Sequence, residues 1–228
     1  MDRNPILCAI DTPDLARAQS LIAATAGAVG GVKLGLEFFV AHGPDGIRKA
    51  AAGQTNVFLD LKLHDIPNTV AGAVKSVLPL DPLLLTIHCG GGPAMMRAAV
   101  EARGGARAKI VGVTVLTSLD DNDLTAVGQS KPAADQVKRL ALLAQESGLD
   151  GVVCSPQEVA MLRGACRKDF LLVVPGIRPA GAAIGDQKRV QTPRDAIAAG
   201  ADYLVIGRPI TEAADPGAAA RAIAAEMP

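Results

Sequence analysis

The chain has 228 residues, of which 49% are hydrophobic and 20% are charged, and its 23 basic and 23 acidic side chains cancel to a net charge of zero. This composition excludes a disordered chain, and the balanced charge excludes binding to nucleic acid or to an anionic membrane through bulk electrostatics. Aromatic residues make up only 2%, so stacking surfaces for single-stranded nucleic acid are not expected.

Short apolar segments rich in β-branched residues recur along the chain and predict strands. In chain order, these segments are Ile6–Ile10, Gly31–Leu34, Asn56–Leu63, Leu83–His88, Lys109–Leu116, Gly151–Cys154, Leu171–Val174 and Tyr203–Ile206. Alanine-rich stretches with helical periodicity follow most of them, such as Ala71–Leu78, Ala94–Ala102, Ala133–Glu146 and Ala218–Met227. Apolar strands that alternate with helices indicate a parallel sheet covered by helices.

Eight strand segments in a chain of 228 residues fit an α/β fold, the closed (β/α)8 TIM barrel. An open doubly wound sheet is the alternative, but no GxGxxG follows the first predicted strand. No linker-like or low-complexity segment divides the chain, so we expect residues 1–228 to form a single catalytic domain.

The cysteines and the first residues of the chain indicate where in the cell the protein is located. Cys8, Cys89, Cys154 and Cys166 lack the close spacing of a zinc or redox motif, so we expect small buried residues in a reducing cytoplasm. The first residues lack the pattern of a signal peptide, and no segment approaches the roughly 20 apolar residues of a membrane span. We therefore expect a cytoplasmic protein with no membrane association.

Catalytic residues of a (β/α)8 barrel lie at the C-terminal ends of its strands. In this chain those ends carry Asp11, Lys33, the group Asp60, Lys62 and Asp65, then His88, Thr117 and Ser118, Pro175 to Arg178, and Gly207-Arg208-Pro209. We interpret the histidine as a packed side chain rather than a general base. The polar strand ends predict an active site.

The densest group of charges lies on the third predicted strand. Asp60 and Lys62 are two residues apart and point to the same side, whereas leucines at 59, 61 and 63 face the helices. The same parity lets Lys33 enter the barrel, which gives an alternating set with Asp65 in which every charge stays ionised. A structural ion-pair network is the alternative, but buried ion pairs contribute weakly to stability. Asp65 alone also suits a helix N-cap or a turn before Pro67.

The sequence after the eighth predicted strand is typical of an anion-binding site. A short helical stretch follows Gly207-Arg208-Pro209, and proline is favourable at the first helical position. Loops after strands seven and eight commonly bind phosphate in these barrels, and arginine offers a forked, permanently charged donor. We therefore expect Gly207 and Arg208 to bind a phosphate group.

The stretch D-L-K-L-H-D-I-P-N-T at residues 60–69 resembles the motif of the orotidine 5′-phosphate decarboxylase family. The resemblance covers nearly the whole chain. It also includes Asp11, Lys33, Leu116-Thr117-Ser118, Pro175-Gly176-Ile177-Arg178, Asp186-Gln187-Lys188-Arg189 and Ile206-Gly207-Arg208. A bare D-x-K-x-x-D is less specific, because related barrels that act on sugar phosphates share it.

This resemblance implies decarboxylation of orotidine 5′-monophosphate to uridine 5′-monophosphate in de novo pyrimidine biosynthesis, without a metal or an organic cofactor. Lys62 is then the proton donor, and Asp60 lies against the substrate carboxylate and holds Lys62. Lys33 orients Asp60 and contacts the ribose, whose hydroxyls Asp11 binds. The acidic residue Asp65 completes the catalytic group.

The resemblance also implies a homodimer with shared active sites, because Asp65 and Thr69 reach into the site of the partner subunit. The remaining substrate contacts that it implies are Ile66, Thr117, Ser118, Pro175, Arg178, Gln187, Gly207 and Arg208. The glycine-rich segment Pro179–Arg189 is expected to close over the site as a lid.

Two alternatives remain at this point. A metal-dependent decarboxylase or aldolase of the same barrel superfamily would act on a keto-sugar phosphate through a metal-bound enediolate. A non-catalytic phosphate-binding barrel would bind nucleotides without turnover. Lys33 and the Ile66-Pro67-Asn68-Thr69 continuation favour the nucleotide decarboxylase over the metal-dependent enzyme. No motif position is degenerate, which argues against the non-catalytic barrel.

Overall fold

The computed structural model describes residues 4–53, 56–129, 132–179 and 191–227. Eight parallel strands pair in chain order, and the last pairs with the first, so the sheet closes into a barrel. The strands are β1 (Ile6–Ile10), β2 (Gly31–Gly35), β3 (Val57–Leu63), β4 (Leu84–His88), β5 (Lys109–Val113), β6 (Gly151–Val153), β7 (Leu171–Val174) and β8 (Tyr203–Ile206). The predicted (β/α)8 barrel is confirmed, and the open-sheet alternative is wrong.

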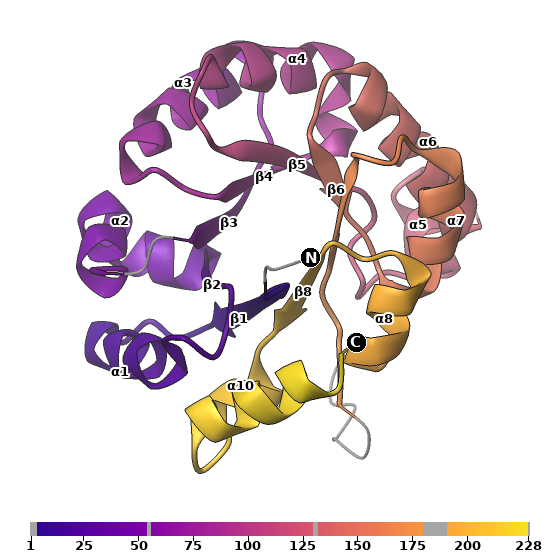
Figure 1. Ribbon diagram of the computed structural model, residues 1–228. Coiled ribbons are helices and arrows are strands. Elements are labelled where there is room, and N and C mark those ends of the chain that lie inside the picture. The colour runs from indigo at the N-terminus through magenta and orange to yellow at the C-terminus, as the bar shows by residue number, and fades with distance from the viewer. Residues whose placement is uncertain (1–3, 54–55, 130–131, 180–190, 228) are drawn as a thin grey trace.

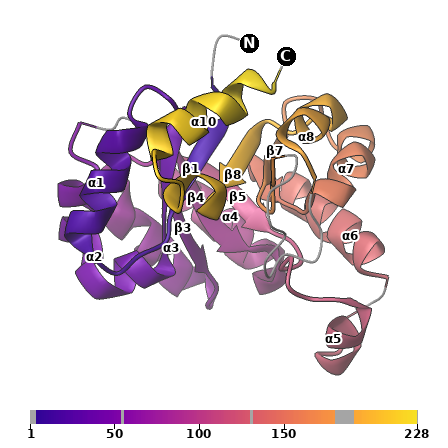
Figure 2. The ribbon, with the colours of Figure 1, turned by 90° about the horizontal axis from the view of Figure 1, so that it is seen from below.

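Helices surround the barrel and cover its outer face (Figure 1). They are α1 (Leu15–Thr25), α2 (Leu36–Ala50), α3 (Pro67–Val77), α4 (Gly92–Arg103), α5 (Asp121–Ala126), α6 (Ala133–Glu146), α7 (Val159–Ala165), α8 (Pro193–Ala199), α9 (Arg208–Thr211) and α10 (Pro216–Ala225). Helix α5 projects beyond the rest of this ring (Figure 2). Within the described residues, no helix is both long and apolar enough to cross a membrane.

Prolines in the first turn explain why two helices begin earlier than their alanine-rich stretches predict. Pro67 and Pro216 open α3 and α10, where a missing N–H removes no helical hydrogen bond. Asp215 caps α10 by accepting a hydrogen bond of 2.9 Å from the Ala218 N–H.

Apolar side chains form two separate cores. The larger core packs the outward faces of the strands against the helices, and it includes Leu59 and Leu61 of β3. The smaller core fills the inside of the barrel with Leu7, Ala9, Phe58, Leu83, Leu84, Val111, Val173, Tyr203 and Val205. Ala9, Phe58 and Val205 of this inner core also line a cavity at the C-terminal end of the barrel.

Strand β5 ends at Val113, three residues before the predicted end at Leu116. The reason is its partner: β6 has only three residues, and Val153, its last, pairs with Val113. Thr114 continues the contact through its side chain, since its hydroxyl donates to the Val153 carbonyl at 2.9 Å. The chain that follows is free to turn across the end of the barrel.

Candidate active site

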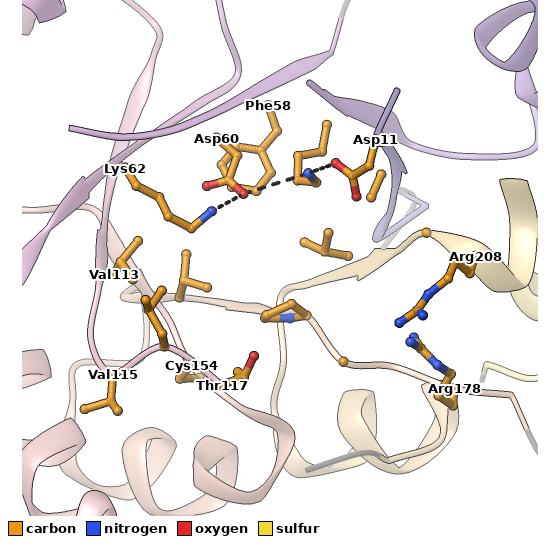
Figure 3. Close-up of a pocket in the computed structure, with 18 of the residues that line it drawn as sticks. Asp11, Phe58, Asp60, Lys62, Val113, Val115, Thr117, Cys154, Arg178 and Arg208 are labelled. Carbon is orange, nitrogen blue, oxygen red and sulfur yellow. Dashed lines mark hydrogen bonds and ion pairs between the residues drawn. The ribbon is translucent and has the colours of Figure 1, made fainter. Parts of the chain in front are cut away.

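A cavity of about 470 Å³ opens at the C-terminal ends of the strands. Its lining includes Asp11 after β1, Thr117 after β5, Arg178 after β7 and Arg208 after β8 (Figure 3). The volume lies within the range of small-molecule sites, and this end of the barrel is where such enzymes place their chemistry.

Four charged side chains alternate in sign along one wall of the cavity (Figure 3). The Lys33 ammonium lies 2.7 Å from Asp11 Oδ1 and 3.9 Å from Asp60 Oδ2. The Lys62 ammonium donates to the same Asp60 oxygen at 2.7 Å. Each charge therefore has a neighbour of opposite sign, and the side chains of Lys33 and Asp60 are largely buried.

Strand pairing explains how Lys33 reaches this wall. Lys33 of β2 pairs with Ala9 of β1 and Phe58 of β3, and both of these belong to the core inside the barrel. Gly35, the last residue of β2, leaves room for the ion pair, since a Cβ there would lie 3.1 Å from Lys33 Nζ and 3.6 Å from Asp11 Oδ1. The predicted inward direction of Lys33 is therefore confirmed.

Strand β3 is irregular where it carries the site. Its pairing with β4 shifts in register between Leu59 and Leu63. Lys62 lies in this irregular stretch with a φ of 49°. The left-handed region costs a non-glycine residue roughly 1–2 kcal/mol, and such strain concentrates at functional sites. Asp60 and Lys62 do face each other as predicted, but simple alternation along a regular strand does not describe Lys62.

Thr86 of β4 supports this irregular stretch and was not among the predicted site residues. Its hydroxyl accepts a hydrogen bond of 2.8 Å from the Lys62 main-chain N–H and donates one of 3.0 Å to Asp60 Oδ1. The sequence held a signal for it: Leu84, Thr86 and His88 alternate, and Leu84 belongs to the core inside the barrel. A threonine on the inward face of an apolar strand marks a polar contact within the barrel.

Two arginines gather at another end of the cavity. The guanidinium groups of Arg178 and Arg208 converge in Figure 3, on the side of the cavity opposite Lys62. Gly207 precedes the short helix α9 and lines the cavity beside them. Two converging guanidinium groups favour an anion between them, and their forked N–H groups match the geometry of a phosphate.

An apolar wall forms part of the cavity lining. It consists of Phe58, Val113, Val115, Leu116, Val153 and Cys154. Burial raises the pKa of the Cys154 thiol, so this side chain stays neutral and behaves as an apolar group. The wall therefore suits a flat, neutral ring held between a cationic proton donor at one end and an anion site at the other.

Comparison with known proteins identifies the family. The family model described as "Orotidine 5'-phosphate decarboxylase / HUMPS family" matches residues 4–223. The chain belongs to this family. It is 55% identical over 231 residues to a curated relative named orotidine 5′-phosphate decarboxylase from Paramagnetospirillum magneticum, with 98% of each chain covered. A relative of the same name from Novosphingobium aromaticivorans is 56% identical over 224 residues, covering 98% of this chain and 99% of the other.

A solved structure gives the same result in three dimensions. The crystal structure of orotidine 5′-phosphate decarboxylase from Lactobacillus acidophilus superposes with a TM-score of 0.86 at 38% identity, and 98% of each chain is covered. The barrel described above is therefore the barrel of the orotidine 5′-phosphate decarboxylase family.

Most residues that the family motif singles out meet in the cavity. Its lining includes Asp11, Lys33, Asp60, Lys62, Thr117, Pro175, Arg178, Gly207 and Arg208. Gln187 and the expected lid, from residue 180 onward, lie outside the described residues. Ser118 is exposed and does not belong to the lining, because the chain after Thr117 turns outward toward α5.

The second half of the family motif lies outside this chain's own cavity. Asp65, Ile66 and Thr69 are all exposed, and Ile66 is 65% exposed although it is apolar. Asp65 accepts a hydrogen bond from the adjacent Ile66 N–H at 2.6 Å, and the N-cap position of α3 is Ile66 itself. Asp65 is therefore not the N-cap of α3, but it does lie in the bend that precedes Pro67, as the other half of that alternative predicts. Within one chain, the alternating array contains Asp11 in the place expected for Asp65.

His88 ends β4 as a packed side chain, as predicted. Its ring stacks on His64 with ring centroids 5.2 Å apart. Burial, together with the neighbouring His64 and Lys62, lowers the pKa of His88, so the ring is neutral near pH 7. The cysteines also follow expectation: Cys8, Cys89 and Cys154 are buried, and all four thiols are free.

Proposed function

We propose that this chain decarboxylates orotidine 5′-monophosphate to uridine 5′-monophosphate in de novo pyrimidine biosynthesis, with Lys62 as the proton donor. The observation that carries the proposal is the alternating array of Asp11, Lys33, Asp60 and Lys62, which lines the same cavity as two arginines and an apolar wall. Membership of the family and the names of its close relatives support the same reaction.

The chemistry follows from the position of one fixed ammonium group. The bond between ring carbon 6 and the carboxylate breaks, CO2 leaves, and the electron pair remains on carbon 6. A preorganised cation beside that carbon stabilises the developing charge. Lys62 then transfers a proton from Nζ to carbon 6 and regains one from water. Asp60, 2.7 Å from Lys62 Nζ, holds the ammonium in place, and it faces the departing carboxylate.

The other lining residues bind the rest of the nucleotide. Asp11 and Lys33 lie at the end of the array and suit the ribose hydroxyls. Thr117 and Pro175 adjoin the ring, and Ser118 contacts it if its loop folds inward. Gly207, Arg208 and Arg178 take the phosphate together with Gln187. Binding energy from the phosphate, which is remote from the reacting carbon, can stabilise the transition state.

The functional unit in this proposal is a homodimer. Asp65, Ile66 and Thr69 lie outside the cavity of their own chain and carry an exposed apolar side chain among them, which suits a partner subunit. Residues 1–228 would then act as one domain. A cytoplasmic location accords with the four free thiols.

Turnover is expected to be independent of metal. Within the described residues, no group of three or more His, Cys, Asp or Glu side chains is placed to hold a metal ion. The loss of orotidylate absorbance should proceed at the same rate in metal-free buffer with and without a chelator. Turnover that stops with chelator and returns with magnesium would instead favour the metal-dependent keto-sugar-phosphate alternative.

Arg208→Gln is expected to impair only substrates that carry the phosphate. Loss of a charge-assisted contact of about 1.5–3 kcal/mol should lower kcat/KM for orotidine 5′-monophosphate by roughly 10- to 150-fold. The value for orotidine, which lacks the phosphate, should be unchanged. Arg221→Gln, at an exposed arginine on α10, serves as the matched control. Equal losses for both substrates would place Arg208 elsewhere than at the phosphate.

A further inference from the structure

We infer that Thr86 is a positioning residue for the decarboxylation, because its hydroxyl fixes both the backbone of Lys62 and the carboxylate of Asp60. The inference rests on the proposed function and adds a residue that lies outside the family motif. Thr86 is fully buried in the middle of β4 and does not line the cavity, so it acts through its two neighbours rather than on the substrate.

The first part of the argument is the pairing of β3 with β4. Leu59 pairs with Leu85 and Leu63 pairs with Ile87, so four steps along β3 are matched by only two along β4. The extra length of β3 bulges out of the ladder between these pairs. Lys62 lies within the bulge, and its main-chain N–H donates to the Thr86 side chain at 2.8 Å. The hydroxyl therefore takes the place of a strand partner.

The second part is the direction of the two hydrogen bonds. A main-chain N–H can only donate, so Thr86 Oγ1 is the acceptor from Lys62. The single hydroxyl hydrogen is then left for the contact of 3.0 Å with Asp60 Oδ1. Both oxygens of Asp60 are now assigned: Oδ1 accepts from Thr86, and Oδ2 accepts from the Lys62 ammonium at 2.7 Å.

These contacts close a ring in which both ends of Lys62 are tied to one hydroxyl. The main-chain end bonds to Thr86 directly, and the ammonium bonds to the carboxylate that Thr86 orients. Without the hydroxyl, the Asp60 carboxylate can rotate. The Lys62 main-chain N–H in the bulge also loses its hydrogen-bond acceptor. The ammonium would then shift relative to carbon 6, and a misplacement of about 1 Å can cost about 100-fold in rate.

Other buried threonines of this chain bond differently. The hydroxyl of Thr25, also fully buried, donates to main-chain carbonyls within α1, with the Leu21 oxygen at 2.8 Å. The hydroxyl of Thr114 donates to the Val153 carbonyl. Both contacts satisfy a buried hydroxyl and nothing more. Thr86 instead contacts an ionised side chain of the charged array, and this difference gives it a role beyond packing.

The test compares Thr86→Val and Thr86→Ala, which lack the hydroxyl, with Thr86→Ser, which keeps it. We expect both hydroxyl-free variants to lower kcat by roughly 30- to 100-fold, while serine stays within about fivefold of the wild type. The Kd of uridine 5′-monophosphate should change less than about threefold in all three, because the product needs no proton transfer. Thr25→Val should leave kcat unchanged, since that residue is remote from the site.

Several outcomes would overturn the inference. One is a kcat within fivefold of the wild type in a folded hydroxyl-free variant; another is a serine variant as slow as the alanine variant. Thermal unfolding of each protein shows which variants fold. If Thr86→Val does not fold, the comparison of kcat between Thr86→Ala and Thr86→Ser tests the inference. Wild-type protein that fails to turn over orotidine 5′-monophosphate would overturn the proposed function as well, whereas an active wild type with active variants removes only the role of Thr86.

Discussion

Replacement of Lys62 by alanine is expected to abolish decarboxylation of orotidine 5′-monophosphate while the barrel stays folded. The substitution removes both the proton donor and the fixed positive charge beside carbon 6. A proton donor contributes about 10²- to 10⁴-fold, and removal of one preorganised donor to a developing charge costs about 10²- to 10³-fold, so kcat should fall by at least about 10⁴-fold. Binding of uridine 5′-monophosphate should persist, because the arginines and the ribose contacts remain.

The Lys62→Ala protein should fold because the buried carboxylate of Asp60, which loses its contact with Lys62, retains two other interactions. Asp60 still accepts the Thr86 hydrogen bond of 3.0 Å and still lies 3.9 Å from the Lys33 ammonium. Thermal unfolding of the Lys62→Ala protein, measured in parallel with the spectrophotometric assay, checks that it is folded. Lys75→Ala, at an exposed lysine in the last turn of α3, is the matched control and should keep full activity. A Lys62→Ala protein within tenfold of the wild type would mean that another group supplies the proton.

The sequence allowed the barrel and most of the charged wall to be predicted for a simple physical reason. Parallel strands buried on both faces are apolar except where they end, so a polar residue at a strand end stands out. A closed parallel barrel brings all such ends to one rim. Asp11, Lys33 and Arg208 are far apart in the chain and meet there without any local signal that joins them.

The irregularity at Lys62 lay beyond that reasoning. The period of two that placed Asp60 and Lys62 on one face assumes a regular strand. The bulge arises instead from the register between β3 and β4, which local sequence does not determine. The alternation of Leu84, Thr86 and His88 indicates an inward threonine, but not its partners, because its hydroxyl matters only once the bulge leaves the Lys62 N–H without a strand partner.

The composition of the alternating array also differed from expectation. Asp65 follows Asp60 and Lys62 closely in the sequence, but the chain turns outward between β3 and α3, so it is exposed. Asp11, on the adjacent strand end, takes the free side of Lys33 at 2.7 Å. Membership of the charged array therefore follows from closeness between neighbouring strand ends at the rim of the barrel, and not from closeness along the chain.

A mixture of Asp65→Ala and Lys62→Ala proteins is expected to regain activity that neither protein has alone. Asp65 lies outside the cavity of its own chain, so we propose that it completes the cavity of a partner. In a mixed dimer, one site combines both substitutions and is dead. The other site combines an intact Lys62 from one chain with an intact Asp65 from the other. Random exchange between symmetric dimers should restore about a quarter of the wild-type sites.

The matched control for this experiment pairs two residues of the same cavity. Asp60 and Lys62 contact each other within one chain at 2.7 Å, so a mixture of Asp60→Ala and Lys62→Ala proteins contains no intact site in any dimer and should stay inactive. Differently tagged subunits that copurify would establish that exchange has occurred. If exchange is complete and the Asp65→Ala mixture still shows no activity, the sites are not shared. Asp65 would then have to reach its own cavity through a movement of the turn between β3 and α3.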